Sequence, residues 1–142
     1  MLRSFLCMLI CSVTMQSLTA QETGAWIRIN QAGYLPGDIK VAVFISKEET
    51  TDPSGFRILD MRTGDCVFSG SREDGLMVLA PAEKWGMGMA YRLNFSNLQK
   101  EGGYRISIDL PGKGRVESPG FRIGTEVYEG TADFLLTYMR KQ

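Results

Sequence analysis

One segment near the amino terminus limits the possible folds more than any other part of the chain. It is residues 26–44, with the sequence WIRINQAGYLPGDIKVAVF. Ile27 and Ile29 alternate with polar neighbours, and beyond a turn the odd positions from Ile39 to Ile45 are all apolar. A period of two is typical of β-strands, because successive side chains point to opposite faces of a sheet. The segment therefore predicts a strand, a turn and a second strand.

The same alternation recurs along the chain, between turns rich in Gly, Pro, Asn and Asp. Further strands are predicted near residues 56–61, 66–68, 76–79, 89–95, 104–110 and 121–123. Apolar residues change parity near Asp60, where we expect a bulge or a strand end. Seven or eight antiparallel strands at spacings of roughly ten residues predict an all-β fold, an immunoglobulin-like β-sandwich. A barrel is the alternative, because the two bridging cysteines typical of immunoglobulin domains are absent.

The first twenty residues have the organisation of a secretory signal peptide. Arg3 precedes an apolar run from Phe5 to Val13, and small and polar residues lead to Ala20. The apolar run is too short for a membrane-spanning helix, which needs roughly 20 apolar residues. We therefore expect cleavage after Ala20 and a secreted or periplasmic protein, with a retained anchor as the alternative.

Removal of residues 1–20 takes away Cys7 and Cys11 and leaves Cys66 as the single cysteine. No internal disulfide can then form, so the stability of the mature chain depends on its apolar core. A chain of about 120 residues buries somewhat over 60% of its unfolded surface, which suits one domain. Cys66 lies in a short apolar strand and the chain has no His. We expect a buried, inert thiol at this position rather than a nucleophile.

The charges of the chain are balanced, with 16 Lys and Arg against 16 Asp and Glu, and the two signs are interspersed. Without a basic stripe, nucleic acid is not an expected partner. Without a basic amphipathic helix, no membrane contact is expected after signal cleavage. The carboxylates are scattered and Gly112-x-Gly114 resembles a hairpin turn rather than a phosphate loop, so we expect no metal and no cofactor.

After Gly124 the apolar period changes to that of a helix. Thr125 is the expected cap of an amphipathic helix of roughly 16 residues. Its apolar positions are Val127, Tyr128, Ala132, Leu135, Tyr138 and Met139. An isolated helix of this length is marginal in water, so its apolar face needs a cover. We expect residues 125–142 to begin a second, truncated helical domain, and a helix docked on its own sandwich is the alternative.

The turn in the opening segment is similar to a signature of one known module. Asn30, Gln31, Gly33 and Tyr34 form an Asn-Gln-x-Gly-Tyr turn, which resembles the opening of the amino-terminal immunoglobulin-like module of family 9 glycoside hydrolases (cellulases). Three later stretches resemble the same module in the same order. They are Phe56-Arg57-Ile58-Leu59-Asp60 followed by Thr63-Gly64, then Asn94-Phe95-Ser96 with Gly103-Tyr104, and then Ser118, Phe121, Ile123 and Tyr128. Ala132, Phe134, Leu135 and Arg140 resemble the first helix of the family's catalytic domain.

The resemblance implies that residues 21–124 are an accessory module of a secreted enzyme that cleaves β-1,4-glucans by an inverting mechanism. It also implies that the catalytic acids lie beyond Gln142, so no catalytic residue is expected here. The expected partner is the catalytic domain in cis, and β-glucan is met through the parent enzyme. The residues predicted to contact the catalytic domain are Tyr34, Trp85, Tyr128, Leu135 and Tyr138.

Two other functions are alternatives to this one. Inverting glycosidases need two spaced carboxyl groups, one with a raised pKa. The pairs Asp60 with Asp65 and Glu73 with Asp74 lie in polar turns, where solvent favours ionised carboxylates, so we interpret them as surface charges. The second alternative is an independent β-glucan-binding module that stacks a sugar ring on Trp85, which glycines flank.

Overall fold

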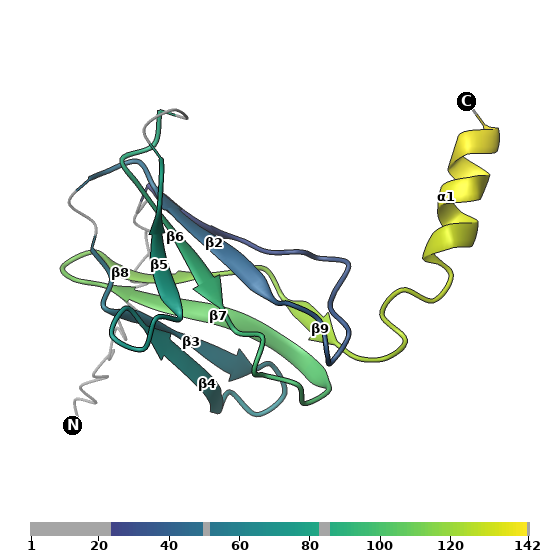
Figure 1. The fold of residues 1–142 in the computed structure, drawn as a ribbon, viewed down its shortest axis with the longest axis horizontal. Helices are drawn as coiled ribbons and strands as arrows, with labels where there is room; N and C mark the ends of the chain where they lie inside the picture. The colour runs from purple at the N-terminus through teal and green to yellow at the C-terminus, as the bar shows by residue number, and fades with distance from the viewer. Residues whose placement is uncertain (1–23, 50–51, 83–85, 142) are drawn as a thin grey trace, which may run out of the picture.

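Two β-sheets pack face to face, and a linker leads from them to one helix (Figure 1). The structure is a computed structural model that describes residues 24–49, 52–82 and 86–141. All strand pairings in both sheets are antiparallel. The two-layer arrangement confirms the predicted immunoglobulin-like sandwich and not the barrel.

The first layer is a four-stranded sheet. Its strands in spatial order are β1 (Ala25–Arg28), β2 (Val41–Ser46), β6 (Met89–Asn94) and β5 (Met77–Ala80).

The second layer is a five-stranded sheet. Its order is β4 (Cys66–Ser71), β3 (Gly55–Asp60), β7 (Gly102–Leu110) and β8 (Gly114–Glu117), and β9 (Phe121–Ile123) also pairs with β7. Strand β8 was not predicted, because Val116 is its only buried residue and no alternation is visible in so short a segment.

Strands β8 and β9 pair with successive parts of β7. β8 pairs with Ser107 to Leu110, and β9 pairs with Gly102 to Tyr104. Ser118 lies between the two strands and its backbone N–H donates to the carbonyl of Ile106 at 2.9 Å. The side-chain oxygen of Ser118 accepts from the N–H of Ile106, also at 2.9 Å. The ladder is therefore continuous across the break in the strand.

In strand β2 the odd-numbered residues, whose apolar character predicted the strand, lie on the outer face of the sheet. Ala42 and Phe44 are buried in the core, while Val43 and Ile45 are half-buried on the outer face and Ile39 is 83% exposed. Both faces of β2 are apolar, so alternation alone did not show which face is internal. The outer face has a shallow apolar hollow of about 240 Å³ that Val43 and Ile45 help to line.

The bulge predicted near Asp60 corresponds to a register shift between Ile58 and Leu59. Ile58 pairs with Phe68 and Leu59 pairs with Cys66, so Val67 of β4 has no partner in β3. An extra residue in one strand is the defining feature of a β-bulge.

Aromatic rings close one end of the core. Tyr34 lies edge-on to Phe95 and to Phe121, with ring centroids 5.6 and 6.0 Å apart. Phe121 also contacts Phe95 and Tyr104, at 5.4 and 6.0 Å. Aromatic pairs in this distance range add stability beyond their buried area. The cluster lies beside β9, which begins with Phe121 and whose last residue, Ile123, forms a bridge with Tyr34.

The single described helix is α1 (Thr131–Arg140), so the predicted start at Thr125 was wrong. Residues before it form turns, in which Glu129 donates to Glu126 and Thr131 donates to Tyr128. Gly130 has a φ of 73°, and a left-handed residue there prevents a continuous helix from passing through it.

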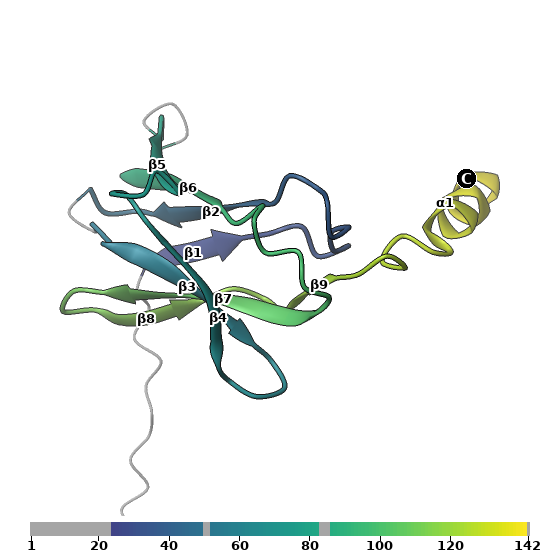
Figure 2. The same ribbon diagram turned by 60° about the horizontal axis from the view of Figure 1, so that its bottom comes forward.

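In both views α1 lies apart from the two sheets (Figures 1 and 2), whereas the alternative of a docked helix would place it against the sandwich. Phe134 and Met139 are 72% and 71% exposed. The side chain of Leu135 lies outside the described part of the structure. Within the described residues, no helix has the length and hydropathy needed to cross a membrane.

Candidate interdomain surface

The turn between β1 and β2 is organised by its own side chains. The Asn30 amide oxygen accepts from the N–H of Ala32 at 3.0 Å, and its amide nitrogen donates to the Gly33 carbonyl at 2.9 Å. The Tyr34 hydroxyl donates to the carbonyl of Val41 at 3.2 Å, across the turn. Burial raises the pKa of Tyr34 above its ordinary value, so the phenol stays a neutral donor.

This turn is also paired with the last strand of the sandwich. The N–H of Tyr34 donates to Arg122 at 3.0 Å, and the N–H of Gly124 donates to the Tyr34 carbonyl at 3.0 Å. Tyr34 and Ile123 form an isolated parallel bridge. The beginning and the end of the module therefore meet at one end of the sandwich.

The linker after β9 continues along the turn. The Tyr128 hydroxyl donates to the Gly33 carbonyl at 2.8 Å, and the N–H of Thr125 donates to the Glu101 carboxylate at 3.3 Å. Glu101 was missed by sequence reasoning, because no local pattern marks a side chain that contacts a backbone group 24 residues away. We call Asn30, Gly33, Val127 and Tyr128 the linker anchor.

A shallow groove of about 740 Å³ lies beside the linker anchor. Its lining mixes charged, polar and apolar groups, and includes Gln31, Met61, Arg122, Val127 and Glu129. Met61 is 56% exposed although its side chain is large and apolar. Such a surface, at the point where the chain leaves the sandwich, is suited to contact with a neighbouring domain.

The residues predicted for the interdomain interface lie in different environments. Tyr34 is in the core and 6% exposed, so its ring packs within the module. Tyr128 lies on the linker, and Tyr138 is exposed on α1. Trp85 lies in residues 83–85, outside the described ranges. The interdomain role of these residues stays a prediction.

Trp26 is the tryptophan that the structure describes. It lies on the outer face of β1, paired with Ile45, and 39% of it is exposed. The Lys47 ammonium lies 5.4 Å from the centre of the ring. A cation in this position interacts with the face that a sugar would need for stacking.

The carboxylates considered for catalysis form turns. The Asp60 side chain accepts from the N–H of Arg62 at 2.8 Å, and that hydrogen bond lowers the pKa of Asp60. The Asp74 side chain accepts from the N–H groups of Leu76 and Ser71, which lower its pKa as well. A general acid needs the opposite shift, so neither carboxyl is suited to donate a proton near neutral pH.

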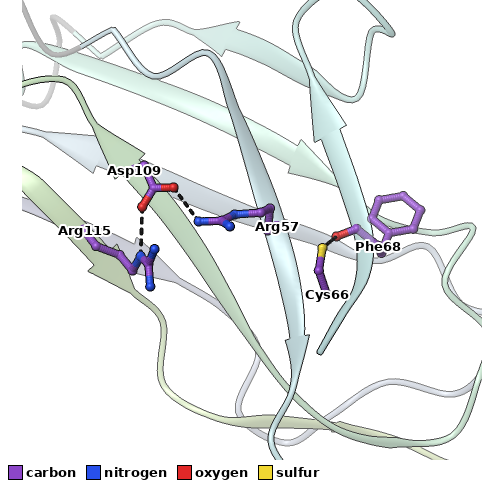
Figure 3. Close-up of polar contacts among 5 residues, drawn as sticks. All are labelled: Arg57, Cys66, Phe68, Asp109 and Arg115. Carbon is purple, nitrogen blue, oxygen red and sulfur yellow. Dashed lines mark hydrogen bonds and ion pairs between the residues drawn. The ribbon is translucent and has the colours of Figure 1, made fainter. Parts of the chain in front are cut away.

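Figure 3 shows two further groups on the five-stranded sheet. Cys66 is exposed, and its thiol donates to the Phe68 carbonyl at 3.4 Å. The prediction of a buried thiol was wrong, because Cys66 begins an edge strand beside the bulge.

Asp109 accepts hydrogen bonds from Arg57 and, at 2.8 Å, from Arg115 (Figure 3). The Arg115 hydrogen bond is the main cause of a lowered pKa at Asp109. All three side chains are well exposed, where ion pairs contribute about 0 to 1 kcal/mol. Among the described residues, no group of His, Cys, Asp and Glu is arranged to hold a metal ion.

Two antiparallel sheets in this order, closed at one end by an aromatic cluster, define an immunoglobulin-like module. The model of the cellulase N-terminal Ig-like domain matches residues 22–113, and the chain belongs to that family. The match confirms the resemblance seen in the Asn-Gln-x-Gly-Tyr turn.

Two solved structures are similar to the chain. One is a metagenome-derived glycoside hydrolase family 9 endoglucanase, with 30% identity over 74% of this chain and 19% of that enzyme, at a TM-score of 0.55. The other is the family 9 endoglucanase J30, with 28% identity over 66% of this chain and 15% of that enzyme, at a TM-score of 0.52. The chain therefore spans less than a fifth of the length of either enzyme. No curated protein matches it.

Proposed function

We propose that this chain is the accessory module of a secreted family 9 glycoside hydrolase, and that it packs against the catalytic domain and stabilises it. In this proposal residues 125–142 lead into that domain and α1 is its first helix. The observation that carries the proposal is the uncovered apolar surface of α1, beyond a linker that is hydrogen-bonded to the sandwich.

We expect another domain to pack on α1 because the large apolar side chains of this helix are exposed. The helix has ten residues, and helices shorter than about 12 residues are marginal in water without tertiary packing. Phe134, Tyr138 and Met139 are all more than half exposed. Large apolar side chains that are exposed together mark interaction sites. A catalytic domain in the same polypeptide would cover them.

The similar enzymes support the chemical part of the proposal. Both are named as endoglucanases, so a polysaccharide is the proposed substrate of the parent enzyme. The module would contribute to this activity through structure, because Asp60 and Asp74 have lowered pKa values and take part in turns. Export rests on the signal peptide predicted for residues 1–20.

The proposal is tested by comparing variants of the parent enzyme. Phe134→Ser combined with Met139→Ser should lower its melting temperature, because burying a large apolar side chain contributes about 1.5 to 3 kcal/mol. The control is Val78→Ser, because Val78 is 53% exposed and belongs to β5. That strand lies away from the linker (Figure 1). Equal melting temperatures for the double variant and the control would show that α1 is not buried in the enzyme.

A second test separates this role from independent glucan binding. Residues 21–124 should not be retained on insoluble cellulose if the module is structural. Retention that Trp85→Ala abolishes would support the binding module instead.

A further inference from the structure

The Asn-Gln-x-Gly-Tyr turn contacts a part of the chain far from it in sequence. Its Gly33 carbonyl accepts a hydrogen bond from Tyr128, 95 residues later. We propose that the linker anchor sets the direction in which the chain leaves the sandwich, and so the orientation of the segment after Tyr128. This goes beyond the proposed function, because it assigns an orienting role to particular residues and applies to any domain attached at this point.

The turn holds the Gly33 carbonyl in a fixed position as a hydrogen-bond acceptor. It receives two donors, the Asn30 amide nitrogen at 2.9 Å and the Tyr128 hydroxyl at 2.8 Å. The Asn30 side chain is itself positioned, because its oxygen accepts from the N–H of Ala32. The carbonyl is thus oriented by the turn and can select one position for the Tyr128 ring.

The backbone of Gly33 also makes room for the linker. Its φ is 100°, which side chains rarely tolerate. A Cβ atom at this position would lie 2.9 Å from the Arg122 carbonyl oxygen and 3.1 Å from the Val127 Cβ. Real contacts are longer, so a side chain here would displace either β9 or the linker. Glycine at this position therefore allows Val127 to pack directly on the turn.

Further hydrogen bonds attach β9 and the residues directly after it to the sandwich. Tyr34 is bonded to Arg122 and Gly124, and the N–H of Thr125 is bonded to Glu101. Gly130 differs from this stretch, because a Cβ added there would meet no atom within 4 Å. The described contacts therefore attach the linker to the sandwich as far as Tyr128, and Gly130 lies beyond them.

The test uses this chain with Tyr128→Phe, which removes one hydroxyl and retains the ring. The matched control is Tyr138→Phe on the exposed helix. Amide hydrogen exchange is measured at Glu129 and Thr131, whose N–H groups donate to the carbonyls of Glu126 and Tyr128 and close the turns on either side of Tyr128. Loss of one hydrogen bond should speed their exchange about fivefold in Tyr128→Phe. Exchange at Ile108 in the core should not change.

Equal exchange rates in Tyr128→Phe and Tyr138→Phe would overturn the inference. Nitrogen relaxation gives a second readout, in which residues 125–129 should have lower order parameters in Tyr128→Phe than in the control. Unchanged order parameters would also contradict an orienting role. Both measurements are made without the catalytic domain. A failure here therefore leaves the proposed stabilising function intact, and a failure of that function leaves this result intact.

Discussion

The hydroxyl oxygen of Ser118 accepts a hydrogen bond from the backbone N–H of Ile106 at 2.9 Å. The same hydroxyl donates to the carbonyl of Pro119 at 2.8 Å. Ile106 is fully buried, so its N–H has no access to water. A side chain thus completes the β-ladder where the strand is interrupted.

Ser118→Ala should therefore destabilise the module. The variant leaves the N–H of Ile106 buried without an acceptor, which costs about 1 to 3 kcal/mol. Urea denaturation of the two proteins measures the difference in the free energy of unfolding. The matched control is Ser69→Ala, at an exposed position of β4. A loss no larger than that of the control would show that the Ser118 hydroxyl is dispensable.

Ser107→Ala should have the opposite effect. Ser107 is fully buried, and its hydroxyl has no hydrogen-bond partner within the described residues. Because a buried hydroxyl without a partner is unfavourable, alanine should leave stability unchanged or raise it by up to about 1 kcal/mol. Thermal unfolding should then show a melting temperature equal to or a few degrees above that of the parent chain. A clear decrease would show that the hydroxyl is bonded in solution.

Asp74→Asn should reduce the sensitivity of the fold to acid. The pKa of Asp74 is lowered in the folded state by the N–H groups of Leu76 and Ser71. Its contribution to stability is therefore present above the ordinary aspartate pKa of about 3.8 and is lost as the pH falls through the lowered value. Asparagine keeps an acceptor oxygen but does not titrate. The free energy of unfolding, measured at pH 5 and pH 3, should fall less in Asp74→Asn than in the unchanged chain. Glu73→Gln is the neighbouring control, and an equal effect there would contradict the assignment to Asp74.

Cys66 should react with a maleimide in the folded protein. Its side chain is exposed on the edge strand β4, so no unfolding is needed for access. Mass spectrometry of residues 21–142 under native conditions should show one adduct, and the labelling rate should not depend on the unfolded fraction. Labelling that increases in proportion to the unfolded fraction would show a protected thiol.

Periodicity was enough to predict most of the strands and the sandwich class. It failed where tertiary contacts decide the outcome. In β2 both parities are apolar, and only the packing of Phe44 against the opposite sheet shows which face is internal. β8 has a single buried side chain, so it left no pattern to find. Helical spacing began at Val127, but Val127 packs on Gly33 and the helix starts only after Gly130.

The candidate interdomain surface was predictable only in part. The turn residues Asn30, Gly33 and Tyr34 could be identified from their order, and Tyr128 from the apolar stripe. Their contact could not, because the Gly33 carbonyl and the Tyr128 hydroxyl are 95 residues apart in sequence. Tyr34 was predicted to contact the catalytic domain, and the structure places its ring at the end of the core and pairs its backbone with β9.

The outermost strands of both sheets have a consequence for solubility. β1, β5 and β8 have four residues each, and β4 contains the irregularity at Val67. A long, regular edge strand acts as a template on which another chain can add a strand. A short or irregular edge strand offers few aligned donors and acceptors. The edges of this module therefore offer few aligned donors and acceptors for the addition of a strand from a second chain.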